Sequence, residues 1–206
     1  MLRVPPASTL VLSIAAALGL ALLGWAAANT RWPGNDAGYM PEQPVPFSHR
    51  LHAGELEVGC SYCHSSADEG RYAGMPSAST CMNCHRFVSA ASETVKSEIW
   101  AAAREGREVR RVVSDAVRAL YLSQGLDSDL QPLPGTSPRP IAWSEVTRFP
   151  DLAYFHHGAH SRVGVECDEC HGPVYEMERT FLAEDLSMGS CVDCYREANR
   201  SRSYGD

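Results

Sequence analysis

Residues 47–85 read FSHRLHAGELEVGCSYCHSSADEGRYAGMPSASTCMNCH, in which an F-x-H-x-x-H motif precedes two C-x-x-C-H motifs. Residues 155–195 read FHHGAHSRVGVECDECHGPVYEMERTFLAEDLSMGSCVDCY and repeat these parts in the same order, except that the last motif ends in Tyr. Because the same parts recur in one order with small insertions, the sequence predicts an internally duplicated module.

The C-x-x-C-H motif is typical of c-type haem attachment, in which two thiols form thioethers and the adjacent His ligates the iron. With eight Cys and eight His in 206 residues, chance gives such a motif on the order of 0.01 times. Three are present, so we predict three haems c, with a fourth possible. The predicted thioether residues are Cys60, Cys63, Cys81, Cys84, Cys167 and Cys170, and the predicted proximal ligands are His64, His85 and His171.

Two H-x-x-H pairs ahead of the motifs supply candidates for the second axial ligand. The candidates are His49, His52, His157 and His160. On a helical turn, residues i and i+3 project to neighbouring directions, so each pair could reach two different irons. Three bis-His haems need only three of the four, and the sequence leaves the pairing open. His156 faces Ser48 in the alignment of the copies and is predicted not to ligate.

The fourth motif is altered, with Tyr195 following Cys191 and Cys194 where His is expected. Tyr can ligate ferric haem, so a fourth haem at these residues stays possible. Tyr is a poor ligand for ferrous iron, however, and the motif lacks the His that completes an attachment site. We therefore expect no ordinary haem here, with the two cysteines as a disulfide or free thiols.

Zinc is the main alternative for the cysteines. Cys63 and Cys81 are separated by 17 residues, and Cys170 and Cys191 by 20, which fits the spacing of zinc ribbons. Two ribbons would leave the adjacent histidines without a role. Thiolate zinc sites are also more typical of reducing compartments than of exported domains.

Residues 10–28, LVLSIAAALGLALLGWAAA, contain no charge and as a helix would span about 28 Å, close to the hydrocarbon thickness of a bilayer. A secretory signal cleaved after the small residues 26–28 is the alternative. The run is longer than a signal core, so we predict an uncleaved single-pass anchor in the cytoplasmic membrane. Residues 1–9 are then cytoplasmic, and the haem domain lies on the periplasmic face.

The remaining chain divides into four predicted parts: a linker (29–46), haem module 1 (47–92), a helical insert with a Pro-rich linker (93–140), and haem module 2 (141–206). An apolar stripe at 3-4 spacing predicts one helix from Glu93 to Gln124. Elsewhere few stretches alternate as strands do, so we expect short helices and coil around the haems. Apolar residues beside the motifs, such as Tyr62, Met75, Met82 and Phe87, are expected to pack against porphyrin.

The formal net charge is −7, from 25 acidic and 18 basic residues. A nucleic-acid-binding protein needs a basic face, so this class is excluded. The acidic balance favours a protein partner with a basic patch instead.

The quoted motifs, together with PIAWSEVTRFPDLAYFHHGAH and LSMGSCVDC, resemble the membrane-anchored multihaem cytochrome c subunit of alternative complex III. More broadly, they are similar to class III cytochromes of the c3/c7 type. The likeness covers residues 38–87 and 139–196, over half of the chain. Members of that family have one N-terminal anchor and typically five bis-His haems, whereas this chain has three intact motifs, one altered motif and no fifth.

The resemblance implies an electron-transfer subunit rather than an enzyme in its own right. Its implied partners are the integral-membrane and iron–sulfur subunits of a quinol-oxidising complex, with a soluble or membrane cytochrome c or an oxidase as acceptor. Three alternatives stay open: a haem enzyme or small-ligand sensor with an exposed fourth iron, a zinc-ribbon protein, and a purely structural assembly subunit.

Overall fold

The computed structural model describes residues 7–29, 38–147, 153–184 and 186–203. Most of the predicted cytoplasmic flank, residues 1–9, and part of the predicted linker lie outside these ranges. Within them the regular structure is helical, with no strand, and Leu126 and Pro132 form an isolated bridge. The elements are α1 (Ala7–Asn29), η1 (Arg50–Glu55), α2 (Cys60–Cys63), α3 (Ala78–His85), α4 (Ser92–Glu105), α5 (Asp115–Ser123), α6 (His157–Ser161), α7 (Asp168–His171), η2 (Val174–Glu176) and α8 (Met188–Ser203). The expectation of short helices and coil is confirmed.

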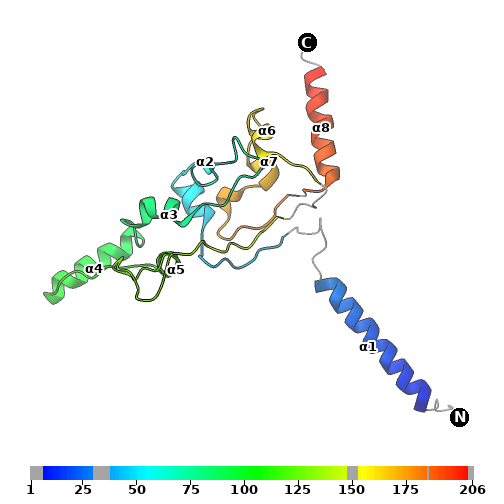
Figure 1. Ribbon diagram of the computed structural model, residues 1–206, viewed down its shortest axis with the longest axis horizontal. Coiled ribbons are helices and arrows are strands. Elements are labelled where there is room, and N and C mark those ends of the chain that lie inside the picture. Colours follow the sequence, from blue (N-terminus) through cyan, green and yellow to red (C-terminus); the bar gives the residue numbers. More distant parts are fainter. Residues whose placement is uncertain (1–6, 30–37, 148–152, 185, 204–206) are drawn as a thin grey trace.

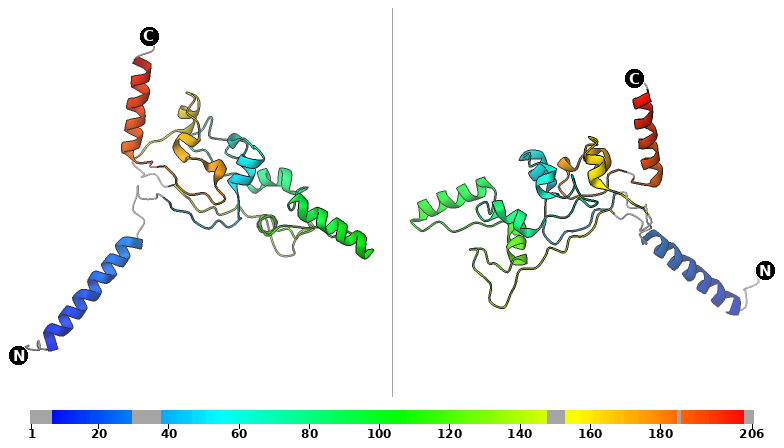
Figure 2. Two further views of the ribbon diagram at one scale, coloured as in Figure 1. Left: turned by 180° about the vertical axis from the view of Figure 1, so that it is seen from behind. Right: turned by 45° about the horizontal axis from the view of Figure 1, so that its top comes forward.

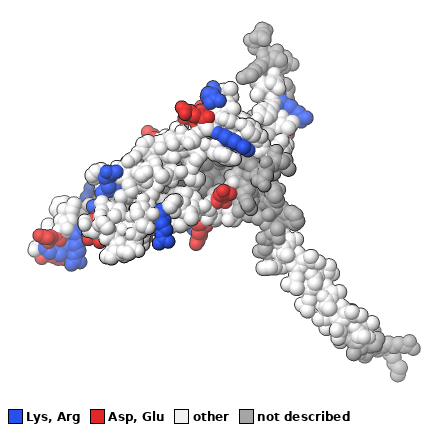
Figure 3. Space-filling view, in the orientation of Figure 1, with Lys and Arg blue, Asp and Glu red and all other residues white. Residues whose placement is uncertain are grey.

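Helix α1 projects away from the body as one straight helix (Figure 1). Its segment Ser8–Ala28 has a mean hydropathy of 2.2 and none of it is buried against the rest of the chain. Charged side chains are scattered over the body, whereas α1 shows none (Figure 3). The helix is long and apolar enough to cross a membrane, and the same properties fit a signal sequence.

The four helices that carry the C-x-x-C pairs follow one another across the body in the order α3, α2, α7, α8, which differs from their order in the chain (Figures 1 and 2). Helices α4 and α5 extend the body beyond α3. Helix α8 begins at the opposite end (Figure 1). The two copies of the repeated motif therefore meet in the middle of the row, where α2 of the first copy lies beside α7 of the second.

The apolar core is small and lies around α5 and α3. One cluster joins Val45, Ala78 and Leu120, and the other joins Val113, Val117 and Tyr121. Met82 of α3 packs against both clusters. Because α3 also carries a C-x-x-C-H motif, this core fixes the position of one candidate haem site relative to the insert.

The prediction of one helix from Glu93 to Gln124 is wrong. Helix α4 ends at Gly106, whose left-handed conformation (φ 65°) terminates it, and residues 107–114 are not helical. Ser114 then starts α5 as an N-cap, with its hydroxyl accepting a hydrogen bond from Val117 N. Glycine adopts this conformation at no steric cost, so the chain turns back here although the apolar spacing continues.

The predicted linkers are partly packed against the body. Gln43 exchanges two hydrogen bonds with the main chain of Ser144, at 2.9 and 2.8 Å. Arg139 N donates to Ser123 O at the end of α5 (2.9 Å). The segments before the first module and after the insert are thereby joined beside α5.

The Tyr121 hydroxyl links the insert to α3, because it donates to the main-chain oxygen of His85 and accepts from Arg111. The Tyr121 side chain is fully buried. Tyr121→Phe removes the hydrogen bond to His85 O, whereas Arg111 keeps its bond to Arg86 O. We therefore expect the free energy of unfolding to fall by about 1–3 kcal/mol. Denaturant titration of the protein measures this, with Tyr72→Phe, whose side chain is 69% exposed, as the control expected to change little.

Glu98 ties the end of α4 to the segment that follows it. Hydrogen bonds from the Arg107 guanidinium, and then from Arg110 N, lower the pKa of Glu98 to about 2. A lowered pKa in the folded state stabilises the fold above the ordinary carboxyl pKa, and this contribution is lost as pH falls toward 2. We therefore expect Glu98→Gln to reduce the thermal stability at pH 6 and to flatten its decline between about pH 4.5 and 2. Glu93→Gln, at an exposed ion pair with Lys96, should leave that decline in place.

Candidate haem-attachment site

Each intact motif places its thiols and its proximal His within one helical turn. His64 N donates to Cys60 O (2.9 Å) at the end of α2, and His171 N donates to Cys167 O (3.1 Å) at the end of α7. Residues three and four apart share one side of a turn. All eight cysteines are free thiols, and none is fully buried. This arrangement suits two-point attachment of one flat cofactor.

Cysteines of different motifs are close enough for their charges to interact. Burial raises the pKa of Cys81, and the charge of Cys63 adds to this rise. Burial likewise raises the pKa of Cys167, with an addition from Cys60. The pKa of Cys170 is raised by burial and then by the two cysteines of α8. The four C-x-x-C pairs therefore form a continuous row, α3–α2–α7–α8, with neighbouring thiols at each step.

The rings of the candidate ligands are held through Nδ1. Five Nδ1 atoms lie 2.7–3.0 Å from a main-chain oxygen, which can only accept, so each of these rings carries its proton on Nδ1. The pairs are His52 with Ser48 O, His64 with Gly74 O, His85 with Val88 O, His157 with Arg71 O, and His160 with His156 O. Nε2 of each ring is thereby left as the accepting nitrogen, the pattern of metal-binding histidines. In His160 this nitrogen meets the Tyr195 hydroxyl.

The first His of each H-x-x-H pair is anchored to the other copy of the motif. His49 Nδ1 lies 2.8 Å from the Thr180 hydroxyl, and His157 Nδ1 lies 2.9 Å from Arg71 O. The next main-chain N–H in each copy also crosses over: Arg50 N donates to Met177 O and Gly158 N to Gly70 O. Each distal turn is therefore supported by the loop that follows the proximal His of the opposite copy.

The second His of each pair is anchored within its own copy and stacks on a Phe. Phe47 stacks on His52 with ring centres 4.4 Å apart, and Phe155 stacks on His160 at 4.6 Å. Each Phe also meets the first His edge-on, at 4.9 and 4.8 Å. The sequence showed these Phe only as part of the repeated motif, and their role in orienting both imidazoles comes from the structure.

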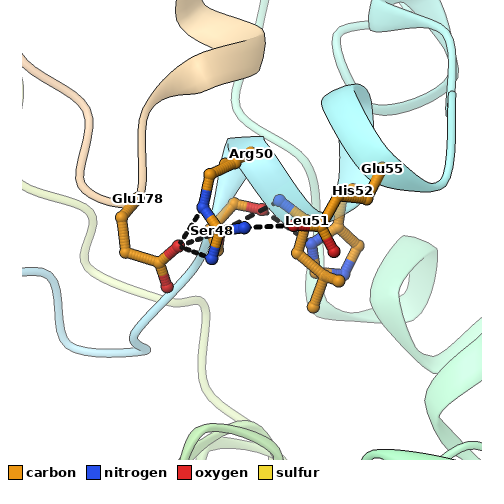
Figure 4. Close-up of polar contacts among 6 residues, drawn as sticks. All are labelled: Ser48, Arg50, Leu51, His52, Glu55 and Glu178. Carbon is orange, nitrogen blue, oxygen red and sulfur yellow. Dashed lines mark hydrogen bonds and ion pairs between the residues drawn. The ribbon is translucent and has the colours of Figure 1, made fainter.

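Polar contacts fix the turn η1 that carries His52 (Figure 4). Glu178 accepts hydrogen bonds from the Ser48 hydroxyl (2.8 Å) and from Arg50 Nε (3.1 Å), and these bonds lower the pKa of Glu178. Arg50 also pairs with Glu55 at the end of η1. Since Glu178 follows η2, these contacts again join the first copy to the second.

Two pairs of imidazoles stand at the spacing that an iron requires. The ring centres of His52 and His85 are 6.0 Å apart, and those of His157 and His171 are 6.4 Å apart. Metal–nitrogen bonds of about 2 Å on both sides, with each Nε2 about 1.2 Å from its ring centre, give about 6.4 Å. The residues therefore fit bis-His haem at the α3 and α7 motifs.

His49 is the candidate that remains for the α2 motif. Burial, and then the charges of His64 and His52, lower the pKa of His49 to about 4. Burial also lowers the pKa of His171, with His157 adding to the effect. Both rings are therefore neutral at neutral pH, which is the form that ligates metals.

The fourth motif is arranged differently. Tyr195 of α8 faces His160, and its hydroxyl lies 3.0 Å from His160 Nε2. His156, predicted not to ligate, caps α6, and its buried Nδ1 has no hydrogen-bond partner among the described residues.

Large apolar side chains beside the motifs are exposed on the protein surface. Phe87 is 78% exposed, Met75 61% and Tyr62 51%. Exposed apolar residues in such a group mark a surface that is covered by something else, and a porphyrin has the required apolar faces. Among the described residues, no three Cys, His, Asp or Glu side chains converge as a metal site.

No family model matches the chain. It is 28% identical over 130 residues to the menaquinone reductase, multihaem cytochrome c subunit, of Nitratidesulfovibrio vulgaris strain Hildenborough. The match covers 63% of this chain and 46% of that protein, so the chain spans about half of its relative's length. This likeness supports a multihaem cytochrome c relationship in general, and not alternative complex III specifically.

Gly158 lies between His157 and His160 and against the loop after α2. A Cβ at this position would lie 2.8 Å from the carbonyl carbon of Glu69, so Gly158→Ala must displace α6. We expect the free energy of unfolding to fall by about 1–3 kcal/mol, measured by thermal unfolding of the isolated protein. Gly59→Ala is the matched control, because no atom lies within 4 Å of a Cβ there; equal losses in both variants would contradict the packing argument.

Proposed function

We propose that the chain is an electron-transfer multihaem cytochrome c, with one haem at each of the three intact motifs. The observation that carries the proposal is the spacing of two imidazole pairs, whose ring centres stand 6.0 and 6.4 Å apart. In these pairs, Nδ1 of His52, His85 and His157 is hydrogen-bonded to a main-chain oxygen. The ligand pairs are His52 with His85, His157 with His171, and His49 with His64. The thioethers come from the cysteines of α2, α3 and α7.

Haem c supplies reversible one-electron oxidation and reduction of its iron. The chain's own residues determine what else is possible at each site. With an imidazole on both faces, they leave no coordination position for a substrate, which favours outer-sphere electron transfer over catalysis. The contiguous row of thiols in α3, α2 and α7 keeps the three sites next to one another, as a relay needs.

We further propose that α1 anchors the chain in the cytoplasmic membrane, with the haem modules on the periplasmic side. The likeness to a menaquinone reductase subunit supports a role as a subunit of a quinone-linked respiratory complex. The partners would be integral-membrane and iron–sulfur subunits, with a cytochrome c or an oxidase as acceptor. The net charge of −7 favours a basic docking face on the acceptor.

The first test is covalent haem content, measured as intact mass and pyridine haemochrome on the membrane-extracted chain. We expect covalently bound haem and a low-spin spectrum that does not change with carbon monoxide. A chain that contains zinc and no haem would contradict the proposed function. Retention of residues 1–28 in the same mass would support the anchor, and their loss would contradict it.

Replacing one distal ligand tests the His–iron pairing. His52→Ala should convert one haem to a high-spin form that binds carbon monoxide, because it opens the position opposite His85. His156→Ala is the control, since that ring faces no proximal His in our assignment, and its spectrum should stay low-spin. If His52→Ala leaves every haem low-spin, the pairing is wrong.

A further inference from the structure

The fourth motif and its facing histidine reproduce the geometry of the α3 site with one change. His160 occupies the place of His52: both rings stack on the Phe of their motif, and both Nδ1 atoms bond to the main-chain oxygen four residues earlier. Tyr195 stands where His85 stands, directly after a C-x-x-C pair. The ring centres of His160 and Tyr195 are 6.2 Å apart, close to the spacing of the His–His pairs.

The contact between the two side chains is nevertheless a direct one. The Tyr195 hydroxyl lies 3.0 Å from His160 Nε2, a hydrogen-bond distance. Two ligands on opposite sides of an iron lie about 4 Å apart, because each bond is about 2 Å long. A phenolic oxygen extends about 2 Å farther from its Cα than an imidazole Nε2 does, so at an unchanged ring spacing the hydroxyl enters the gap that an iron would need.

The proton positions agree with this interpretation. His160 carries its proton on Nδ1, which donates to His156 O (3.0 Å), so its Nε2 can only accept. Tyr195 therefore donates its O–H to the lone pair that an iron would otherwise take.

We propose that Tyr195 closes the fourth site, so that Cys191 and Cys194 carry no haem and His160 is the one distal candidate without an iron. The inference rests on the proposed function and deepens it: the row of four C-x-x-C pairs holds three irons, and the relay ends at the α7 site. The hydrogen bond to His160 serves instead to dock α8 against α6.

The sharpest test restores the missing ligand. In the wild type we expect three haems per chain, with none on the peptide that contains Cys191 and Cys194. Tyr195→His completes the motif, and its shorter side chain opens the gap to His160. The number of haems per chain should then rise from three to four, and the fourth haem should be low-spin. Tyr195→Phe is the control and should stay at three.

Two neighbouring histidines on α6 give an independent readout by absorption or EPR spectroscopy. His160→Ala in the wild-type background should leave all three haems low-spin, whereas His157→Ala should make one high-spin. In the Tyr195→His background, His160→Ala should make the fourth haem high-spin.

Four haems in the wild type, or a high-spin haem in His160→Ala alone, would overturn the inference while leaving the multihaem function intact. A Tyr195→His protein with three haems would also overturn it, because Tyr195 would then not be what closes the site. Absence of haem from every variant would instead contradict the proposed function itself.

Discussion

The hydrogen bonds from imidazole Nδ1 to main-chain oxygens hold the candidate ligands in place, and the rest of the body is arranged around them. Each bond fixes a tautomer and a ring direction at once, so that Nε2 is the ring nitrogen left to accept. His157 is bonded to Arg71 O, in the loop of the opposite copy. The two copies therefore cannot separate without releasing a ligand.

This dependence follows from the small apolar core. Nine hydrophobic residues among those described are buried, and both core clusters lie around α5. Around α2 and α7, the body is held mainly by hydrogen bonds and by close approach of backbone segments, as at Gly54 against Tyr175 O. Under the proposed function, the haems supply the apolar surface that the chain itself lacks, and they complete the core.

The insert stabilises one end of the row. Tyr121 bridges α5 to the main chain of His85, and Met82 connects α3 to both clusters. At the other end, the Tyr195 hydroxyl of α8 lies at hydrogen-bond distance from His160 of α6. The α3 end of the row is thus held by apolar packing and the α8 end by a hydrogen bond. The two ends therefore differ, although the repeated motifs are alike.

The cysteine spacing and the adjacent histidines suffice to predict haem attachment, and the lack of strand-like alternation predicts a helical fold with much coil. The uncharged segment 10–28 predicts a helix long enough to span a membrane. All three predictions depend on residues that are close in sequence. The apolar stripe did not predict the break at Gly106. Val113 precedes the start of α5, whereas Val117 and Tyr121 lie within it, yet the three keep the spacing of one helix. Which distal His faces which motif was left open, because the turns of each copy rest on loops of the other, more than 80 residues away. The direct contact of Tyr195 with His160 was decided only in three dimensions, because the two residues are 35 positions apart in the chain.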